Sequence, residues 1–80
     1  VNMENYNINL ASRLKQFRSS RKITQMDLEL VAGLAMGTIS RIENKRISPT
    51  KETMFRIAHA LKLSRNEIIQ LFGLDAYGFI

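Results

Sequence analysis

Residues 24–44, TQMDLELVAGLAMGTISRIEN, decide the fold because they contain two short helical patterns that meet at one glycine. Thr24 is a favoured N-cap residue and Asp27 follows three positions later, so a helix should run over residues 25–32. Gly33 comes next and is the residue that most easily adopts φ > 0, which ends a helix. The inward residues of this first helix should be Leu28, Val31 and Ala32.

The second half of the same stretch predicts another helix, which begins near Ala35 and buries Ile39 and Ile42. The face opposite these two isoleucines carries small and polar side chains and one arginine. Its members are Met36, Gly37, Thr38, Ser40 and Arg41. The stretch therefore predicts two helices joined by a tight turn.

Three further helices are expected around this pair. Apolar residues at helical spacing predict one helix over residues 10–20. Pro49 and the N-cap candidate Thr50 open a fourth, and a capping box at residues 64–67 opens a fifth that runs through residue 72 and stops at Gly73. No alternating strand pattern or internal repeat competes, so the expected fold class is all-α, a compact five-helix domain.

Composition narrows the function without deciding it. The 80 residues carry a formal net charge of +5 and a sequence pI near 10.1, which suits a polyanionic partner. One histidine, no cysteine and no glycine-rich phosphate loop give no catalytic constellation, cofactor or metal site, so no enzyme is expected. The apolar runs are too short to cross a membrane and no secretory signal is visible, which makes the cytoplasm the expected compartment.

A resemblance adds to this interpretation. The chain resembles the lambda-repressor-like (Cro/XRE-type) helix-turn-helix DNA-binding family, through residues inside the quoted stretch and beyond it. Those inside are Thr24, Gln25, Leu28, Ala32, Gly33, Ile39, Ser40, Ile42, Glu43 and Asn44. Those beyond are Arg18, Ile23, Pro49, Glu52, Thr53, Ile57, Ala58 and Leu61. The resemblance implies a domain over residues 9–74 between a flexible segment, 1–8, and an apolar tail, 75–80.

The family places its third helix in the major groove of double-stranded operator DNA. The resemblance then implies base contacts from Met36, Gly37, Thr38 and Arg41, of which Arg41 suits guanine because its planar fork matches O6 and N7. Contacts to phosphates, which position rather than specify, are implied for seven residues. These are Gln25, Ser40, Asn44, Lys45, Arg46, Ser48 and Lys51.

Arg18 and Glu43 are expected to form a structural ion pair, as the family often pairs them. Four residues depart from the family pattern. Lys22 and Lys45 stand where glycine is common and should adopt φ > 0, at about 1 kcal/mol each. Ala35 replaces the usual Ser or Thr cap of the third helix, and Glu29 replaces a small alanine, so that either the helices shift or the Glu29 stem bends outward.

The family further implies a transcriptional regulator, more often a repressor, that binds a palindromic operator as a homodimer. The expected dimer interface is Ile69, Leu74, Tyr77, Phe79 and Ile80, although the tail can instead fold back onto its own core. Two alternatives stay open. One is a protein-interaction module with an unidentified protein partner, such as an antitoxin or coactivator piece, and the other is the DNA-binding half of a longer effector-sensing regulator.

Overall fold

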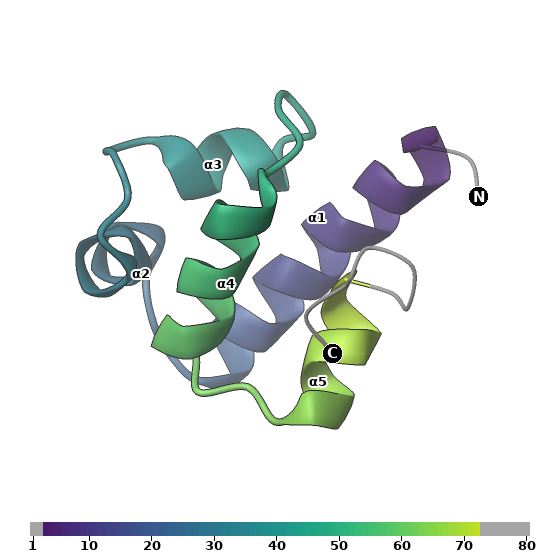
Figure 1. The fold of residues 1–80 in the computed structure, drawn as a ribbon. Helices are drawn as coiled ribbons and strands as arrows, with labels where there is room; N and C mark the ends of the chain where they lie inside the picture. Colours follow the sequence, from purple (N-terminus) through teal and green to yellow (C-terminus); the bar gives the residue numbers. More distant parts are fainter. Residues whose placement is uncertain (1–2, 73–80) are drawn as a thin grey trace.

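The computed structural model describes residues 3–72, and all the regular structure in them is helical (Figure 1). The five helices are α1 (Met3–Ser20), α2 (Gln25–Ala32), α3 (Thr38–Glu43), α4 (Lys51–Ala60) and α5 (Arg65–Phe72). The predicted all-α, five-helix class is confirmed. None of these described helices has the length and apolar content needed to cross a membrane.

Side chains close to the helices fix where several of them begin. The hydroxyls of Thr24 and Thr50 accept the backbone N–H three residues further on, at 3.0 and 3.1 Å, which starts α2 and α4. Ser64 and Glu67 form the reciprocal capping box of α5, with bonds of 3.2 and 2.8 Å. All three predicted starts are confirmed, because each depends on residues that are near neighbours in the sequence.

The ends of α1 to α4 share one backbone pattern. A residue with positive φ follows each helix, and the next N–H reaches back to the carbonyl five residues before it, as in a Schellman motif. The residues with positive φ are Lys22 (55°), Gly33 (69°), Lys45 (63°) and Lys62 (54°). The prediction of positive φ at Lys22 and Lys45 is confirmed, and Lys62 after α4 is a further case that was not predicted.

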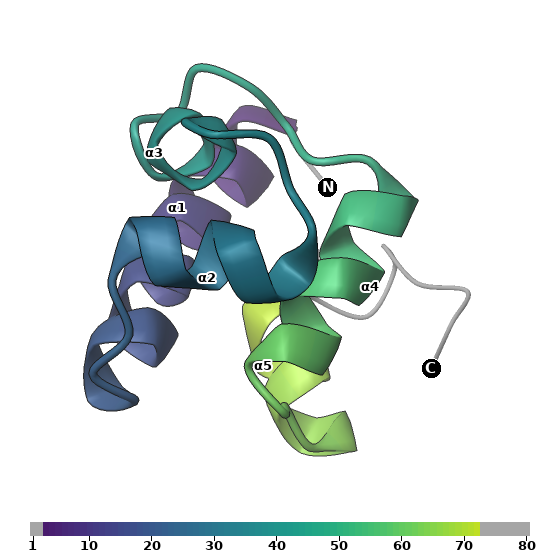
Figure 2. The same ribbon diagram turned by 90° about the vertical axis from the view of Figure 1, so that its left-hand side faces the viewer.

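The core lies where α1 packs against α3 and α5 while α2 packs against α3 and α4. In Figure 1 α2 is seen end-on and α3 from the side, and Figure 2 reverses this, so the two helices cross steeply. Buried aliphatic side chains from all five helices fill the centre together with Phe72. The largest fully buried are Phe72, Leu14, Leu28, Ile39, Ile42, Ile57 and Leu71.

Two helix starts differ from the prediction. α1 begins at Met3 rather than Leu10, so it includes residues 3–8, and its polar early turns extend a helix that is already nucleated. α3 begins at Thr38 rather than near Ala35. Gly37 has φ 88° and ψ −7°, and the Thr38 N–H donates to the Ala35 carbonyl at 3.1 Å, so residues 35–38 form a turn with type II geometry at Gly37.

The buried face of α2 also differs from the prediction. Val31 was expected to point inward, but it is 64% exposed, whereas Glu29 is buried beside Leu28. Because α2 packs against α3 on one side and α4 on the other, its buried stripe passes through residue 29 and misses residue 31. The Glu29 stem therefore turns inward.

Candidate nucleic-acid interface

α3 lies at the edge of the molecule in both views, and its two faces have different surroundings (Figures 1 and 2). Ile39 and Ile42 are buried against the core and fix the rotation of the helix. Arg41 is exposed, Thr38 and Ser40 are half-buried, and Met36 in the preceding turn is 79% exposed. The burial of the isoleucines thus leaves the side that was predicted to face DNA accessible.

Gly37 and Arg41 are close neighbours on this accessible side. A Cβ placed on Gly37 would lie 2.9 Å from Nη1 of Arg41, so the guanidinium passes over the glycine backbone. The positive φ of Gly37 also disfavours any side chain there. Gly37 therefore supplies room for the arginine as well as the turn that precedes α3.

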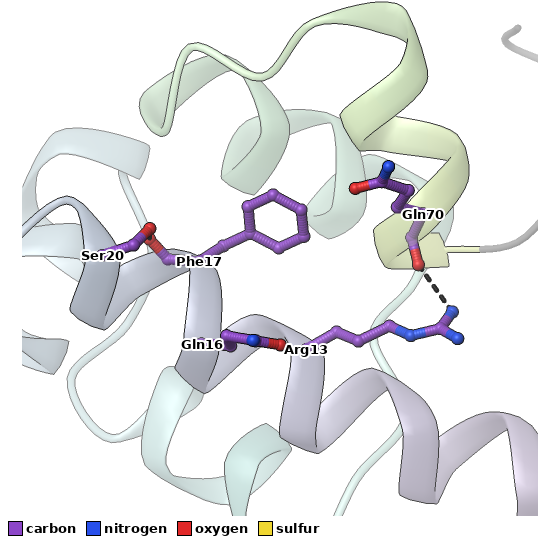
Figure 3. A pocket seen from close by; sticks show the side chains of 5 residues that line it. All are labelled: Arg13, Gln16, Phe17, Ser20 and Gln70. Carbon is purple, nitrogen blue, oxygen red and sulfur yellow. Dashed lines mark hydrogen bonds between the residues drawn. The ribbon is translucent and has the colours of Figure 1, made fainter.

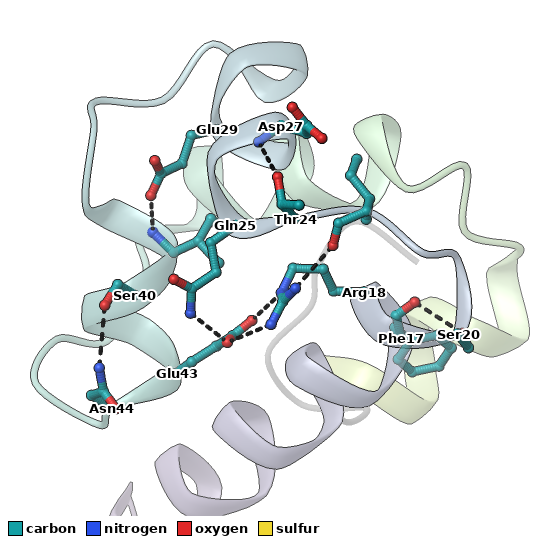
Figure 4. A network of polar contacts seen from close by, with 12 residues as sticks. Phe17, Arg18, Ser20, Thr24, Gln25, Asp27, Glu29, Ser40, Glu43 and Asn44 are labelled. Atoms are coloured by element: carbon teal, nitrogen blue, oxygen red, sulfur yellow. Dashed lines mark hydrogen bonds and ion pairs between the residues drawn. The ribbon is translucent and has the colours of Figure 1, made fainter.

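Glu43, the last residue of α3, is tied to α1 through Arg18 (Figure 4). Nε of Arg18 lies 2.8 Å from Oε2 of Glu43, and Nη2 lies 3.2 Å from Oε1, a bidentate pair. The two side chains are only 13% and 4% exposed. The hydrogen bond with Glu43, aided by the charge of its carboxylate, raises the pKa of the Arg18 guanidinium. Arg18 also donates from Nη1 to the Ile23 carbonyl at 2.9 Å, which fixes the turn before α2.

Gln25 also contacts Glu43, and this hydrogen bond was not predicted from the sequence. Its Nε2 donates to Oε1 of Glu43 at 2.9 Å, so the first residue of α2 is linked to the last residue of α3 (Figure 4). One amide hydrogen of Gln25 is therefore used within the protein. No local spacing signals this contact, because it joins residues 18 positions apart.

Beyond α3, the remaining residues predicted to contact phosphates lie on one continuous segment. Nδ2 of Asn44 donates to Oγ of Ser40 at 3.2 Å, which braces the end of the helix. Lys45, Arg46 and Ser48 are exposed in the connection that follows. Lys51 is exposed at the first position of α4.

The acids near this segment are neutralised by arginines from elsewhere. Glu43 pairs with Arg18, and Glu52 pairs with Arg56 at 2.9 Å. Among the side chains that the structure describes, those of residues 10–72, no ion pair involves the four cations that line α3 and the following segment. These are Arg41, Lys45, Arg46 and Lys51. The surface thus keeps a local excess of positive charge, which attracts polyanions.

A concave region of about 420 Å³ lies between α1 and α5, away from the residues predicted to contact DNA (Figure 3). Its lining residues are Arg13, Gln16, Phe17, Ser20 and Gln70. Nη1 of Arg13 donates to the Gln70 carbonyl at 2.6 Å, and the Ser20 hydroxyl donates to the Phe17 carbonyl at 2.9 Å. The Arg13 bond therefore links α1 to α5, while the Ser20 bond stays within α1, and no cluster of side chains that could hold a metal ion occurs in the described residues.

Only one residue of the predicted dimer interface can be placed. Ile69 is half-buried on α5. Leu74, Tyr77, Phe79 and Ile80 lie outside the described residues, as does the predicted helix stop at Gly73. The dimer interface stays a prediction.

Comparison with known proteins agrees with this geometry. Residues 11–74 match the helix-turn-helix domain family, and the chain belongs to that family, in its Cro/XRE-like branch. Over 62 residues the chain is 34% identical to RghRB, an uncharacterized HTH-type transcriptional regulator of Bacillus subtilis (strain 168). That match covers 76% of this chain and 45% of the relative, so the chain spans about half the length of the relative. No solved structure gave a significant match.

Proposed function

We propose that this chain is a sequence-specific, double-stranded DNA-binding transcriptional regulator that acts as a repressor. The observation that carries the proposal is a set of four cations along α3 and the segment after it that form no ion pair with any described side chain, next to an outward helix face that bears Arg41. The helix-turn-helix family and the regulator relative support it. Repression then follows from occupation of promoter DNA, without any chemical step.

In the proposed complex α3 enters the major groove. Arg41 contacts a guanine edge, while Thr38 and Met36 contact thymine methyl groups where the sequence offers them. Lys45, Arg46 and the other predicted phosphate contacts bind the backbone and set the register. Gln25 contributes its backbone N–H at the start of α2 and the amide hydrogen that Glu43 does not use.

A homodimer on a palindromic operator is the proposed assembly. Two copies related by a two-fold axis would present two α3 helices to half-sites about 34 Å apart, one turn of DNA. Each half contributes few polar base contacts, so two halves and the shape of the DNA between them are needed for useful discrimination.

Two variants test the assigned roles, after an operator is selected from a random duplex pool. Arg41→Ala should lower the preference for the operator over random duplex by about tenfold or more, as expected for one bidentate base contact. Arg46→Ala should lower the affinity for both duplexes by the same factor and reduce the slope of log affinity against log salt by about one. Binding titrations at several salt concentrations measure both. Equal loss of preference in the two variants would contradict the assignment.

A protein-interaction module is the second candidate, because the outer side of α2 exposes large apolar side chains. Met26 and Val31 are each 64% exposed and Leu30 is 80% exposed. Titration with random duplex DNA at low salt separates the two candidates. Micromolar binding supports the DNA proposal, and absence of binding favours a protein partner.

A further inference from the structure

Glu29 is a buried acid that the proposed DNA contacts do not use. Its side chain extends from α2 to the start of α3, where Oε2 accepts the backbone N–H of Ile39 at 2.9 Å (Figure 4). The residue is 5% exposed, and no cation of the described chain forms an ion pair with it. Burial of a carboxylate without a counter-charge costs free energy, so its position in the core needs an explanation.

The start of α3 lacks the local groups that normally cap a helix. Gly37 is the N-cap residue and has no side chain, and Ala35 in the turn before it has no acceptor either. The first N–H groups of a helix have no partner within the helix. Ile39 is 0% exposed, so water does not reach its N–H, and the Glu29 carboxylate is the acceptor that satisfies it.

Because this cap comes from another helix, it also fixes where α3 begins relative to α2. At the other end of α3, Glu43 is held by Arg18 and Gln25. The six-residue helix is thus tied at both ends by polar contacts to neighbouring helices. Arg41, two positions after Ile39, lies between these two attachments, and its reach into a groove depends on both.

We infer that Glu29 is a positioning residue for DNA recognition: it caps α3 from α2 and so sets the orientation in which α3 presents Arg41 to bases. This inference rests on the proposed function. Contacts to phosphates from the flexible cationic side chains tolerate a small tilt of α3, whereas a bidentate contact to a base edge does not. Loss of the cap should therefore reduce sequence discrimination more than general affinity.

Three variants of the full chain test the role. Glu29→Met keeps the length of the stem without an acceptor, and Glu29→Gln keeps an acceptor oxygen without the charge. Asp27→Asn is the matched control, because it removes one negative charge from an exposed position of the same helix. Replacement of a buried carboxylate by an apolar side chain should leave the Met variant folded. If circular dichroism shows that Glu29→Met is unfolded, Glu29→Ala is used in its place.

Two measurements are made on each variant: hydrogen exchange of the Ile39 amide by NMR, and the ratio of affinities for the selected operator and random duplex at fixed salt. In Glu29→Met the Ile39 amide should exchange at least about tenfold faster while the Leu28 amide is unchanged, and the affinity ratio should fall by about five- to tenfold. For Glu29→Gln, the Ile39 exchange rate and the affinity ratio should each stay within about twofold of the original chain.

The results separate this inference from the proposed function. Absence of operator preference in the unaltered chain contradicts the proposed function, while Ile39 exchange still decides whether Glu29 is the cap. An unchanged affinity ratio in Glu29→Met, or an equal fall in Asp27→Asn, overturns the positioning role. Faster Ile39 exchange together with reduced discrimination, confined to the Met and Ala variants, supports it.

Discussion

Glu43 lies on the helix that faces the proposed groove, yet its carboxylate is turned inward to Arg18 and Gln25. Those contacts remove a negative charge from the surface that should meet phosphates. They also connect α1, α2 and α3 at one point, close to the last turn of α1. In the proposed complex, Glu43 would therefore act on DNA binding through the geometry of the helices.

Removal of Glu43 should leave Arg18 largely buried without its partner. We expect Glu43→Ala to lower the free energy of unfolding by about 3 kcal/mol, toward the low end for a broken buried pair because Arg18 keeps some exposure. Urea denaturation measures the loss. The double variant Arg18→Met with Glu43→Leu should lose less than Glu43→Ala alone, since no unpaired charge remains. A double variant that loses as much stability as Glu43→Ala, or more, would contradict this.

At the scale of the helices, the chain departs from the usual residue choice at helix C-termini, where glycine is the common residue with positive φ. Among the ends of α1 to α4, lysine occupies the positive-φ position after α1, α3 and α4, and glycine occupies it after α2. A side chain at positive φ places Cβ near the following carbonyl oxygen, which costs about 1 kcal/mol. The lysines add charge near helix C-termini, which offsets part of that cost.

Lys62→Gly should therefore raise the free energy of unfolding by about 1 kcal/mol, because Lys62 is exposed and its backbone has φ 54°. Thermal or urea denaturation checks the change. Lys62→Ala is the control, since it removes the charge and keeps the strained Cβ, and it should not stabilise the chain. Equal stabilisation by the two substitutions would show that charge rather than backbone conformation is responsible.

The capping box of α5 makes a pH-dependent contribution. The charged Glu67 carboxylate is stabilised mainly by the hydrogen bond from the Ser64 backbone N–H, and to a lesser extent by the one from Arg21. Both lower the pKa of Glu67 below its ordinary value of 4.5. The unfolded chain therefore binds a proton at this group more readily than the folded chain. The resulting stability is complete above about pH 4.5 to 5 and is lost as the pH falls through the folded pKa.

Glu67→Gln should show this directly, because glutamine keeps an acceptor oxygen but does not titrate. The difference in free energy of unfolding between the original chain and the variant should be constant near neutral pH and shrink below about pH 4.5. Urea denaturation over roughly pH 3 to 7, the range in which a carboxylate titrates, measures it. A difference that grows toward acid pH would contradict the direction of the pKa shift.

At the scale of the whole molecule, the proposed DNA binding and the proposed self-association are linked. One copy would present to DNA the six-residue helix α3 with few polar side chains for base contacts, which is little for selective binding. α5, where Ile69 is half-buried, lies on the side of the molecule away from α3 in both views (Figures 1 and 2). A partner copy bound through α5 and the tail would therefore leave both α3 helices available.

Sedimentation of the full chain and of a chain truncated after Gly73 tests this assembly. We expect the full chain to be dimeric at micromolar concentration and the truncated chain to dissociate at least about tenfold more readily, because apolar surface contributed by the tail is lost. Circular dichroism should show that both are folded. A monomer in both cases would remove the homodimer from the proposal.

Local sequence accounts for most of the helices and for several of their boundaries. Thr24, Thr50 and the Ser64 capping box each act within three residues, and Gly33 ends α2 through its own backbone. Such short-range preferences are visible in any linear sequence. The isoleucines of α3 likewise predicted which side of the helix is buried.

The residue pattern was enough to predict the all-α class, the helix-turn-helix pair and the positions from which DNA contacts are proposed. The folded chain was needed to show that α3 begins at Thr38, that Gln25 holds Glu43 and that Glu29 turns inward to cap Ile39. These contacts join residues 10 to 18 positions apart on different helices. The donor and acceptor of each contact come together only when core packing has fixed how the helices cross, so no local sequence pattern predicts these contacts.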